Sequence, residues 1–146
     1  MGDGFTNRFL NTTPYDTTPK KKKSRTKAEN RKFFIEQYIF EPIWNLEART
    51  YFASEEANSF WLKWTDKMTE EYGETMFDLY KEKLFSYSIR ISGILHLLHI
   101  ADYKTENGTW NLPLEIPLHI VKKAIGICEF FMKQYAEMLG NLNTQR

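Results

Sequence analysis

A dense run of basic residues near the N-terminus is the strongest binding signal in this 146-residue chain. Residues 20–32 hold eight bases and one acid, a net charge of +7, whereas residues 33–146 hold eleven bases and sixteen acids, a net charge of −5. Clustered Lys and Arg attract nucleic-acid phosphates through counterion release, without sequence specificity. The candidate phosphate-contacting residues are Lys20, Lys21, Lys22, Lys23, Arg25, Lys27, Arg31 and Lys32. A solvated linker and a nuclear-localisation segment fit the same composition, so DNA contact is one of three open interpretations.

Tryptophan is the second residue type here that suits nucleic acid, because an exposed indole ring can stack on a base. Trp110 follows an Asn107-Gly108 turn signal and is the candidate for such stacking. Trp61 and Trp64 lie at helical spacing, which favours a place in the core.

His96, His99 and Asp102 are side chains of the kind that ligate metals, spaced at i, i+3 and i+6. On a helix they spread over about 120° of the circumference, at 100° per residue. No other segment offers an obvious Cys or His partner apart from His119. We therefore expect histidines that pack and hydrogen-bond, and no metal.

Arg90 is a charge within a helix that is otherwise apolar. If that helix is buried, the guanidinium needs a partner. An ion pair with Glu82 or Glu55 would supply one, and a bound phosphate is the functional alternative.

The sequence contains no nucleophile–base pair, no paired catalytic carboxylates and no glycine-rich phosphate loop, so we expect neither an enzyme nor a cofactor site. The single Cys128 excludes an intrachain disulfide and favours a reducing, cytoplasmic compartment. The longest apolar stretch, residues 89–101, is too short and too often interrupted by polar residues to span a bilayer. No membrane partner is expected.

Two helices must position these residues. One is predicted from about Asp78 to Asp102, apolar on nearly every side and therefore a hub for several neighbours. The other follows Pro117, ends near Gly140 and presents an apolar seam to the hub. The seam residues are Leu118, Val121, Ile125, Cys128, Met132, Tyr135 and Leu139.

Shorter signals predict the remaining elements. Thr26 and Glu29 form a capping box, so a helix should start near Lys27, and Pro42 should kink or restart it with Ile43 and Trp44 facing inward. Ser54 is the expected N-cap of a helix that stops at Gly73. The Asn107-Gly108 turn predicts a hairpin, and the alternating residues 112–116 are candidates to pair with residues 50–53.

The expected fold is mainly α. Four to five helices surround a central apolar helix, with a small β-hairpin or two-stranded element. Residues 1–25 would form a flexible, partly basic arm or linker, and residues 26–142 a single helical domain. The oligomeric state stays open.

Four ordered blocks of the chain resemble the C-terminal helical region of replicative helicase-like proteins from phages, plasmids and other mobile elements. These proteins have a RecA-like ATPase core, in some cases joined to a primase-polymerase. The blocks are GDGFTNRFL, YFASEEANSFWLKW, KLFSYSIRISGILHLLHIAD and EIPLHIVKKAIGICEFFMKQYAEML. The resemblance covers roughly three quarters of the chain.

The resemblance implies that the first block lies at the end of the ATPase core, beside its nucleotide, so Arg8 becomes a candidate nucleotide contact. The chain lacks the phosphate loop of that core and should not hydrolyse ATP by itself. The implied function is an accessory domain in mobile-element DNA replication. It would pack on the parent ATPase core or on other replication proteins and contact DNA non-specifically. The alternative is an independent protein–protein interaction module without a nucleic-acid role.

Overall fold

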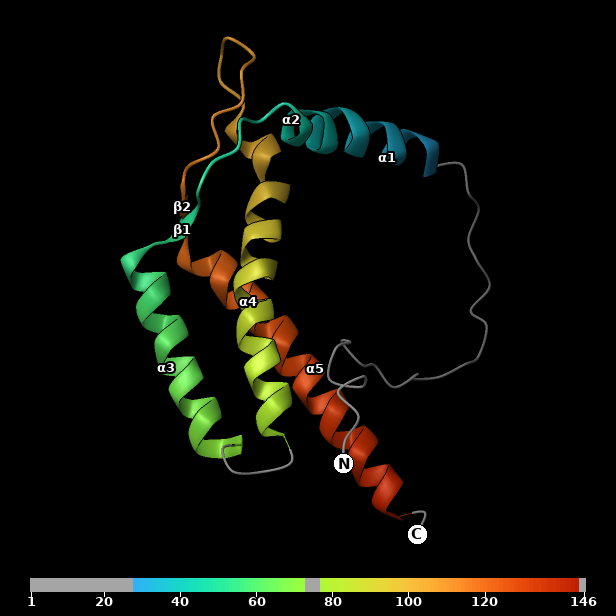
Figure 1. Ribbon diagram of the computed structural model, residues 1–146. Coiled ribbons are helices and arrows are strands. Elements are labelled where there is room, and N and C mark those ends of the chain that lie inside the picture. The colour runs from blue at the N-terminus through green and yellow to red at the C-terminus, as the bar shows by residue number, and fades with distance from the viewer. Residues whose placement is uncertain (1–27, 73–76, 145–146) are drawn as a thin grey trace.

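The computed structural model describes residues 28–72 and 77–144, in which long helices pack together and a small two-stranded sheet lies at one edge, where α3 and α5 begin (Figure 1). The elements in chain order are α1 (Ala28–Ile35), the π-helix η3 (Glu36–Phe40), α2 (Glu41–Trp44), β1 (Phe52–Ala53), α3 (Glu55–Tyr72), α4 (Asp78–Leu98), the 3₁₀ helix η4 (Ile100–Tyr103), β2 (Glu115–Ile116) and α5 (Leu118–Thr144). In this article the body is α3, α4 and α5, and the arm is residues 28–44. The predicted flexible segment at residues 1–25 lies outside the described residues.

The arm is one continuous helical rod whose middle turn is wider than an α-helix. The N–H of Glu41 donates to the carbonyl of Glu36, five residues back, and Pro42 follows in the first turn of α2. Proline has no N–H to continue the regular ladder, and a π turn accommodates that loss without breaking the rod. Pro42 therefore lies in the first turn of the short helix α2, as predicted, although the backbone stays helical through the π turn before it. The inward placement of Trp44 is wrong, because the rod buries Pro42 and leaves the Trp44 side chain almost fully exposed.

α3 begins where its sequence signal predicts. The backbone N–H of Ala57 donates to Ser54 Oγ at 3.1 Å, which is an N-cap bond. Glu55 and Glu56 then occupy the first turn, where carboxylates suit the positive end of the helix. Trp64 and Met68 are buried one turn apart, so this face of α3 packs against α4 and α5.

α4 occupies the centre of the body and contacts α3, α5 and β2. The residues of α4 that are buried at every fourth position form one face of the helix. This face is polar near the C-terminal end of α4. This line of residues consists of Tyr80, Leu84, Ser88, Ser92 and His96. Small serine side chains let neighbouring helices approach closely along such an i, i+4 ridge.

The predicted burial of α4 on nearly every side is wrong, although its central position is confirmed. Ile89, Ile94 and Leu98 are exposed, whereas Leu84 is fully buried. The two long helices α3 and α5 cover two sides of α4, and a third side stays open. The helix also ends at Leu98, earlier than predicted, and η4 continues the chain.

The predicted pairing of residues 50–53 with residues 112–116 is confirmed. β1 and β2 are parallel, with Phe52 opposite Glu115 and Ala53 opposite Ile116. The N–H groups of Phe52 and Ser54 donate to the carbonyls of Leu114 and Ile116, each at 3.0 Å. This pair joins the start of α3 to the start of α5 (Figure 1).

α5 packs its predicted seam into the core. Five of the seven seam residues are buried and the two end residues, Leu118 and Leu139, are half-buried. Tyr135 stacks on Tyr80 of α4, with 4.0 Å between ring centroids. The predicted stop at Gly140 is wrong, because the helix continues to Thr144. A glycine ends a helix where its backbone turns left-handed, and Gly140 does not adopt a positive φ.

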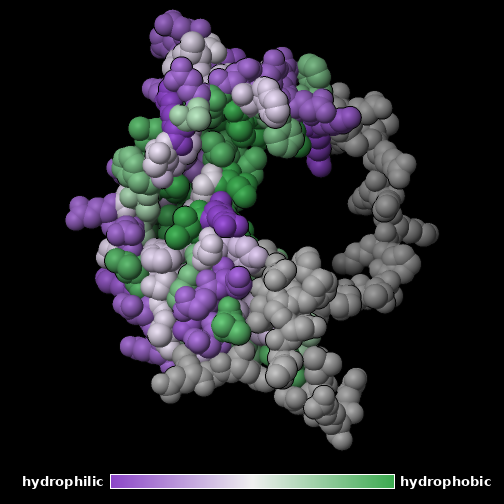
Figure 2. Space-filling model, in the orientation of Figure 1, coloured by the Kyte–Doolittle hydropathy of each residue, from purple (hydrophilic) through white to green (hydrophobic). Residues whose placement is uncertain are grey.

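The body therefore has one hydrophobic core, shared by α3, α4, α5 and β2. Together with the small parallel pair, it confirms the mainly helical architecture predicted from the sequence. Hydrophobic surface also gathers beneath the arm, where the arm joins the upper part of the body (Figure 2). None of the described helices has both the length and the apolar character needed to cross a membrane.

Candidate nucleic-acid interface

Three side chains from separate segments form a cation–aromatic cluster beside the arm. Lys104 Nζ lies 5.2 Å from the centroid of the Trp110 ring and 5.8 Å from the centroid of the Tyr38 ring. An ammonium group at these distances is attracted to the negative faces of the rings. The cluster joins η3 of the arm to the loop before β2, and the contact of η3 and α2 with η4 holds the two segments together.

The hairpin predicted at Asn107-Gly108 is what places Lys104 beside Trp110. These two residues face each other in an antiparallel bridge, and Gly108 adopts the positive φ of 79° that such a tight loop needs. Thr105 ties the loop together, because its N–H donates to the Thr109 carbonyl at 2.7 Å and its hydroxyl oxygen accepts from the Thr109 N–H at 3.1 Å. Trp110 is partly exposed and so remains a base-stacking candidate.

The cluster continues along the arm as a row of aromatic rings that ends beside two basic residues. Phe34 stacks on Tyr38, with 4.8 Å between centroids and 26° between planes. Arg31 and Lys32 precede this pair on α1 and are exposed, although Lys32 lies 3.8 Å from Glu36. A basic segment leading into stacked aromatic rings is the arrangement that binds single-stranded nucleic acid without sequence preference.

The other predicted basic candidates lie outside the described residues. These are Arg8, Lys20, Lys21, Lys22, Lys23, Arg25 and Lys27. Of the remaining tryptophans, Trp64 is buried as predicted. Trp61 is half-buried, and its Nε1–H donates to Ser88 Oγ at 2.7 Å.

The prediction of a buried charge at Arg90 is wrong. Arg90 lies on the open side of α4, is exposed, and forms no ion pair with another described residue. The every-fourth line that faces the core passes through Ser88 and Ser92 and leaves Arg90 between them on the outside. Arg90 therefore needs no buried partner, and neither Glu82 nor Glu55 pairs with it.

His96 and His99 have structural partners. His96 is fully buried, and its Nε2 lies 2.7 Å from the carbonyl oxygen of Pro113. A carbonyl can only accept, so this nitrogen carries the proton, and the bond fastens the segment before β2 to α4. His99 Nδ1 instead lies 3.0 Å from Asp102 Oδ2. Within residues 28–72 and 77–144 no group of three potential ligands is positioned to hold a metal ion.

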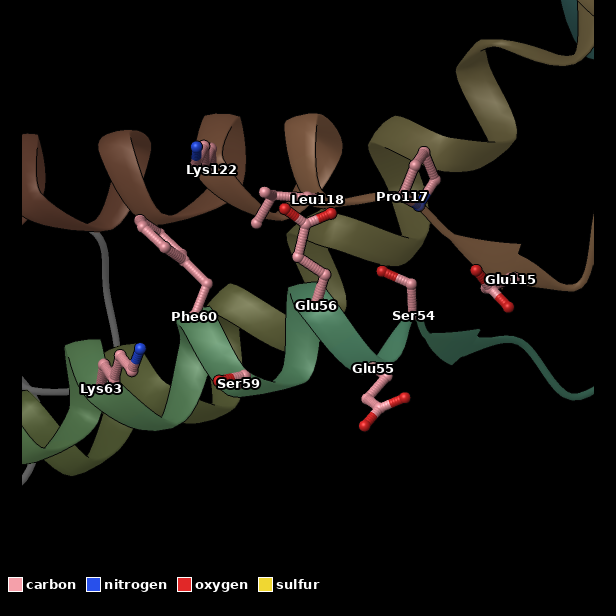
Figure 3. A pocket seen from close by; sticks show the side chains of 10 residues that line it. All are labelled: Ser54, Glu55, Glu56, Ser59, Phe60, Lys63, Glu115, Pro117, Leu118 and Lys122. Atoms are coloured by element: carbon pink, nitrogen blue, oxygen red, sulfur yellow. The ribbon is translucent and has the colours of Figure 1, made fainter.

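A groove between the starts of α3 and α5 has a volume of about 820 Å³ (Figure 3). Glu55, Glu56 and Glu115 line it together with Lys63 and Lys122. Lys122 lies over the Phe60 ring at 5.1 Å. With three carboxylates and two ammonium groups, the groove is a poor site for phosphates.

The single cysteine, Cys128, is unreactive near neutral pH. Burial raises the pKa of the Cys128 thiol to about 12, so the thiolate that would act as a nucleophile or ligand is not formed near neutral pH. Its sulfur lies 3.7 Å from the carbonyl of Leu84 within the core. Cys128 is therefore a packing residue, as its place on the α5 seam predicts.

The sequence analysis did not identify Tyr38 or Lys104 as members of the cation–aromatic cluster. The Asn107-Gly108 turn signal did not single out Lys104, since a two-residue turn there would pair Thr105 with Trp110, whereas the structure pairs Lys104 with Trp110. The contact between the arm and the hairpin had no signal of its own, because it joins residues 66 positions apart.

The chain matches no protein-family model, no curated protein and no solved structure.

Proposed function

We propose that this chain is a non-catalytic accessory domain that contacts DNA through its arm. The observation that supports this most strongly is the cation–aromatic cluster of Tyr38, Lys104 and Trp110, which continues into the basic end of α1. Phosphates bind basic side chains and bases stack on aromatic rings, and here both kinds of group lie along one helix and its neighbouring hairpin.

The resemblance to mobile-element helicase-like proteins gives the domain its proposed context. It would follow a RecA-like ATPase core in a cytoplasmic phage or plasmid replication protein and would hold DNA while the core hydrolyses ATP. Arg8 would then lie at the nucleotide of that core. An independent protein–protein interaction module remains the second candidate, supported by the exposed apolar side chains of the arm.

Fluorescence anisotropy with labelled duplex and single-stranded DNA at several salt concentrations tests the proposal. With about four to six phosphates neutralised, the slope of log K against log salt on duplex should be about −4 to −5. Replacing Lys20, Lys21, Lys22 and Lys23 together by Gln should reduce that slope by several units. A matched control replaces four exposed lysines of the body, Lys63, Lys67, Lys83 and Lys133, and should leave the slope nearly unchanged.

The aromatic contribution needs its own variant. Trp110→Ala should weaken single-strand binding by about 1–3 kcal/mol and duplex binding much less, because only unpaired bases are free to stack. Equal effects of the two quadruple-lysine variants would remove the basic segment, residues 20–32, from the binding site. An absence of binding even at low salt would favour the interaction module.

A further inference from the structure

The arm presents an apolar seam to solvent on the side away from buried Pro42. Phe33, Phe40 and Trp44 are 64%, 58% and 89% exposed. Their spacings of seven and four residues bring them to one side of a helix. Ile39 and Ile43 are half-buried where the arm meets the rest of the chain. The arm is thus apolar on two sides, and residues 28–72 and 77–144 cover only one of them.

A second uncovered apolar surface lies between α4 and α5, here named the α4–α5 groove. Its volume is about 590 Å³, and its lining residues are Leu95, Lys123, Gly126, Ile127, Phe130 and Phe131. Ile127 and Phe130 are exposed, and Ile94 of α4 is exposed on the same helix as Leu95. Gly126 lacks a side chain, and a Cβ there would meet nothing within 4 Å, so a helix can approach closely. Amphipathic helices bind such grooves through residues spaced like the arm seam.

The two surfaces do not cover each other within one chain. Pro42 and the contact of η3 and α2 with η4 fix the C-terminal end of the arm above α4, and α1 leads away from the body (Figure 1). Moving the arm onto its own groove would break this contact and the cation–aromatic cluster. A second copy of the chain supplies both surfaces without that cost.

We propose that two copies associate by exchanging arms, so that the seam of each copy lies in the α4–α5 groove of the other. This arrangement is a closed, twofold-symmetric dimer in which both surfaces are used twice.

The area suffices. With about 150–250 Å² for each aromatic side chain, the exposed fractions leave on the order of 400 Å² of apolar surface on each seam. Two seams and the two grooves they cover then reach the range of about 1,200–2,000 Å² that specific interfaces bury. Glu129 is exposed beside Phe130 and offers a carboxylate to Arg31 or Lys32 of the partner copy's arm.

Sedimentation velocity of the full chain over a concentration series, at high salt and without nucleic acid, tests this proposal independently of DNA binding. The wild-type chain should dimerise. Phe40→Glu combined with Trp44→Glu should reduce the association constant by about 30-fold or more, as should Ile127→Glu alone, because both bury a charge at the centre of the interface. Leu79→Glu is the matched control: Leu79 is equally apolar and exposed but lies outside both surfaces, and the dimer should persist.

A mixing experiment separates arm exchange from other kinds of dimer. The arm variant keeps an intact groove and the groove variant keeps an intact arm, so an equimolar mixture should form a heterodimer through one arm–groove contact. Circular dichroism and melting of each variant show that the fold is retained. A wild-type monomer at ~100 µM, well above the μM dissociation constants of the weaker interfaces of this area, would overturn the proposal. So would a dimer that tolerates the arm variant, or a mixture that stays monomeric.

Discussion

The body and the arm use the same kinds of side chain, but only the body covers them. In the body, Trp64, Leu84 and Met132 come from three helices and are almost completely buried against one another. In the arm, Phe33, Phe40 and Trp44 belong to a single rod that touches the rest of the chain mainly through one side. A helix buries only as many faces as it has neighbours, so the arm carries apolar surface for which the described chain provides no cover. We therefore expect the body to contribute most of the folding stability, and the arm to bind partner molecules.

The largest expected effect separates the two regions by stability. Leu84→Ala should lower the free energy of unfolding by about 2–5 kcal/mol, because it leaves a cavity in the core. Phe40→Ala should lower it by less than about 0.5 kcal/mol, as for an exposed position. Urea denaturation at a low chain concentration, where the proposed dimer does not contribute, measures both. Similar losses from the two variants would show that the arm belongs to the same cooperative core.

Alkaline pH should destabilise the body and not the arm. The pKa of Cys128 is raised to about 12 by burial, whereas the unfolded thiol ionises near pH 9, so the unfolded state releases this proton first. The unfolding free energy should therefore fall as the pH rises from about 9 toward 12, by at most about 1.4 kcal/mol per pH unit for this group. The hydrogen bond that the Lys81 ammonium donates to the Asp78 carboxylate raises the pKa of buried Lys81, and the stabilising contribution of this bond is likewise lost as the pH rises through that folded value.

Cys128→Ala isolates the thiol in this experiment. The substitution lowers stability at every pH through lost packing, but it should flatten the decline above pH 9, with Lys81 and the raised pKa of buried Tyr135 supplying the remainder. Urea denaturation at pH 8, 9, 10 and 11 gives the slopes. Parallel curves for wild type and variant would mean that Cys128 ionises as readily folded as unfolded.

The smallest effect concerns the polar line of α4. Ser88→Ala should cost about 1–3 kcal/mol, because the Nε1–H of Trp61 loses its acceptor in a largely covered position. Ser92→Ala should cost less, since the Ser92 hydroxyl donates only to the Ser88 carbonyl of its own helix. Adding Trp61→Phe to Ser88→Ala removes the unpaired donor, and a double-mutant cycle should show the coupling. Additive losses would mean that this hydrogen bond contributes no stability.

The sequence alone determined the elements whose signals are local. Short sequence spacings predicted the N-cap at Ser54, the start of α4 at Asp78 and the seam of α5. They could do so because a cap bond and a helical face each involve residues only a few positions apart. The pairing of β1 with β2 was also predictable, since two short extended runs stood directly before two helices. The DNA-contacting role of the basic segment and the context of a helicase-like parent remain predictions.

Tertiary structure alone decided which faces are covered. α4 has apolar residues around most of its circumference, so its sequence cannot tell that Ser88 and Ser92 face the core while Ile89, Arg90 and Ile94 face solvent. That choice depends on where α3 and α5 pack. In the same way, only the docking of the arm above α4 brings Tyr38 to Lys104 and Trp110 and turns Trp44 outward. A helix periodicity defines directions around an axis, and the neighbours that occupy those directions come from distant parts of the chain.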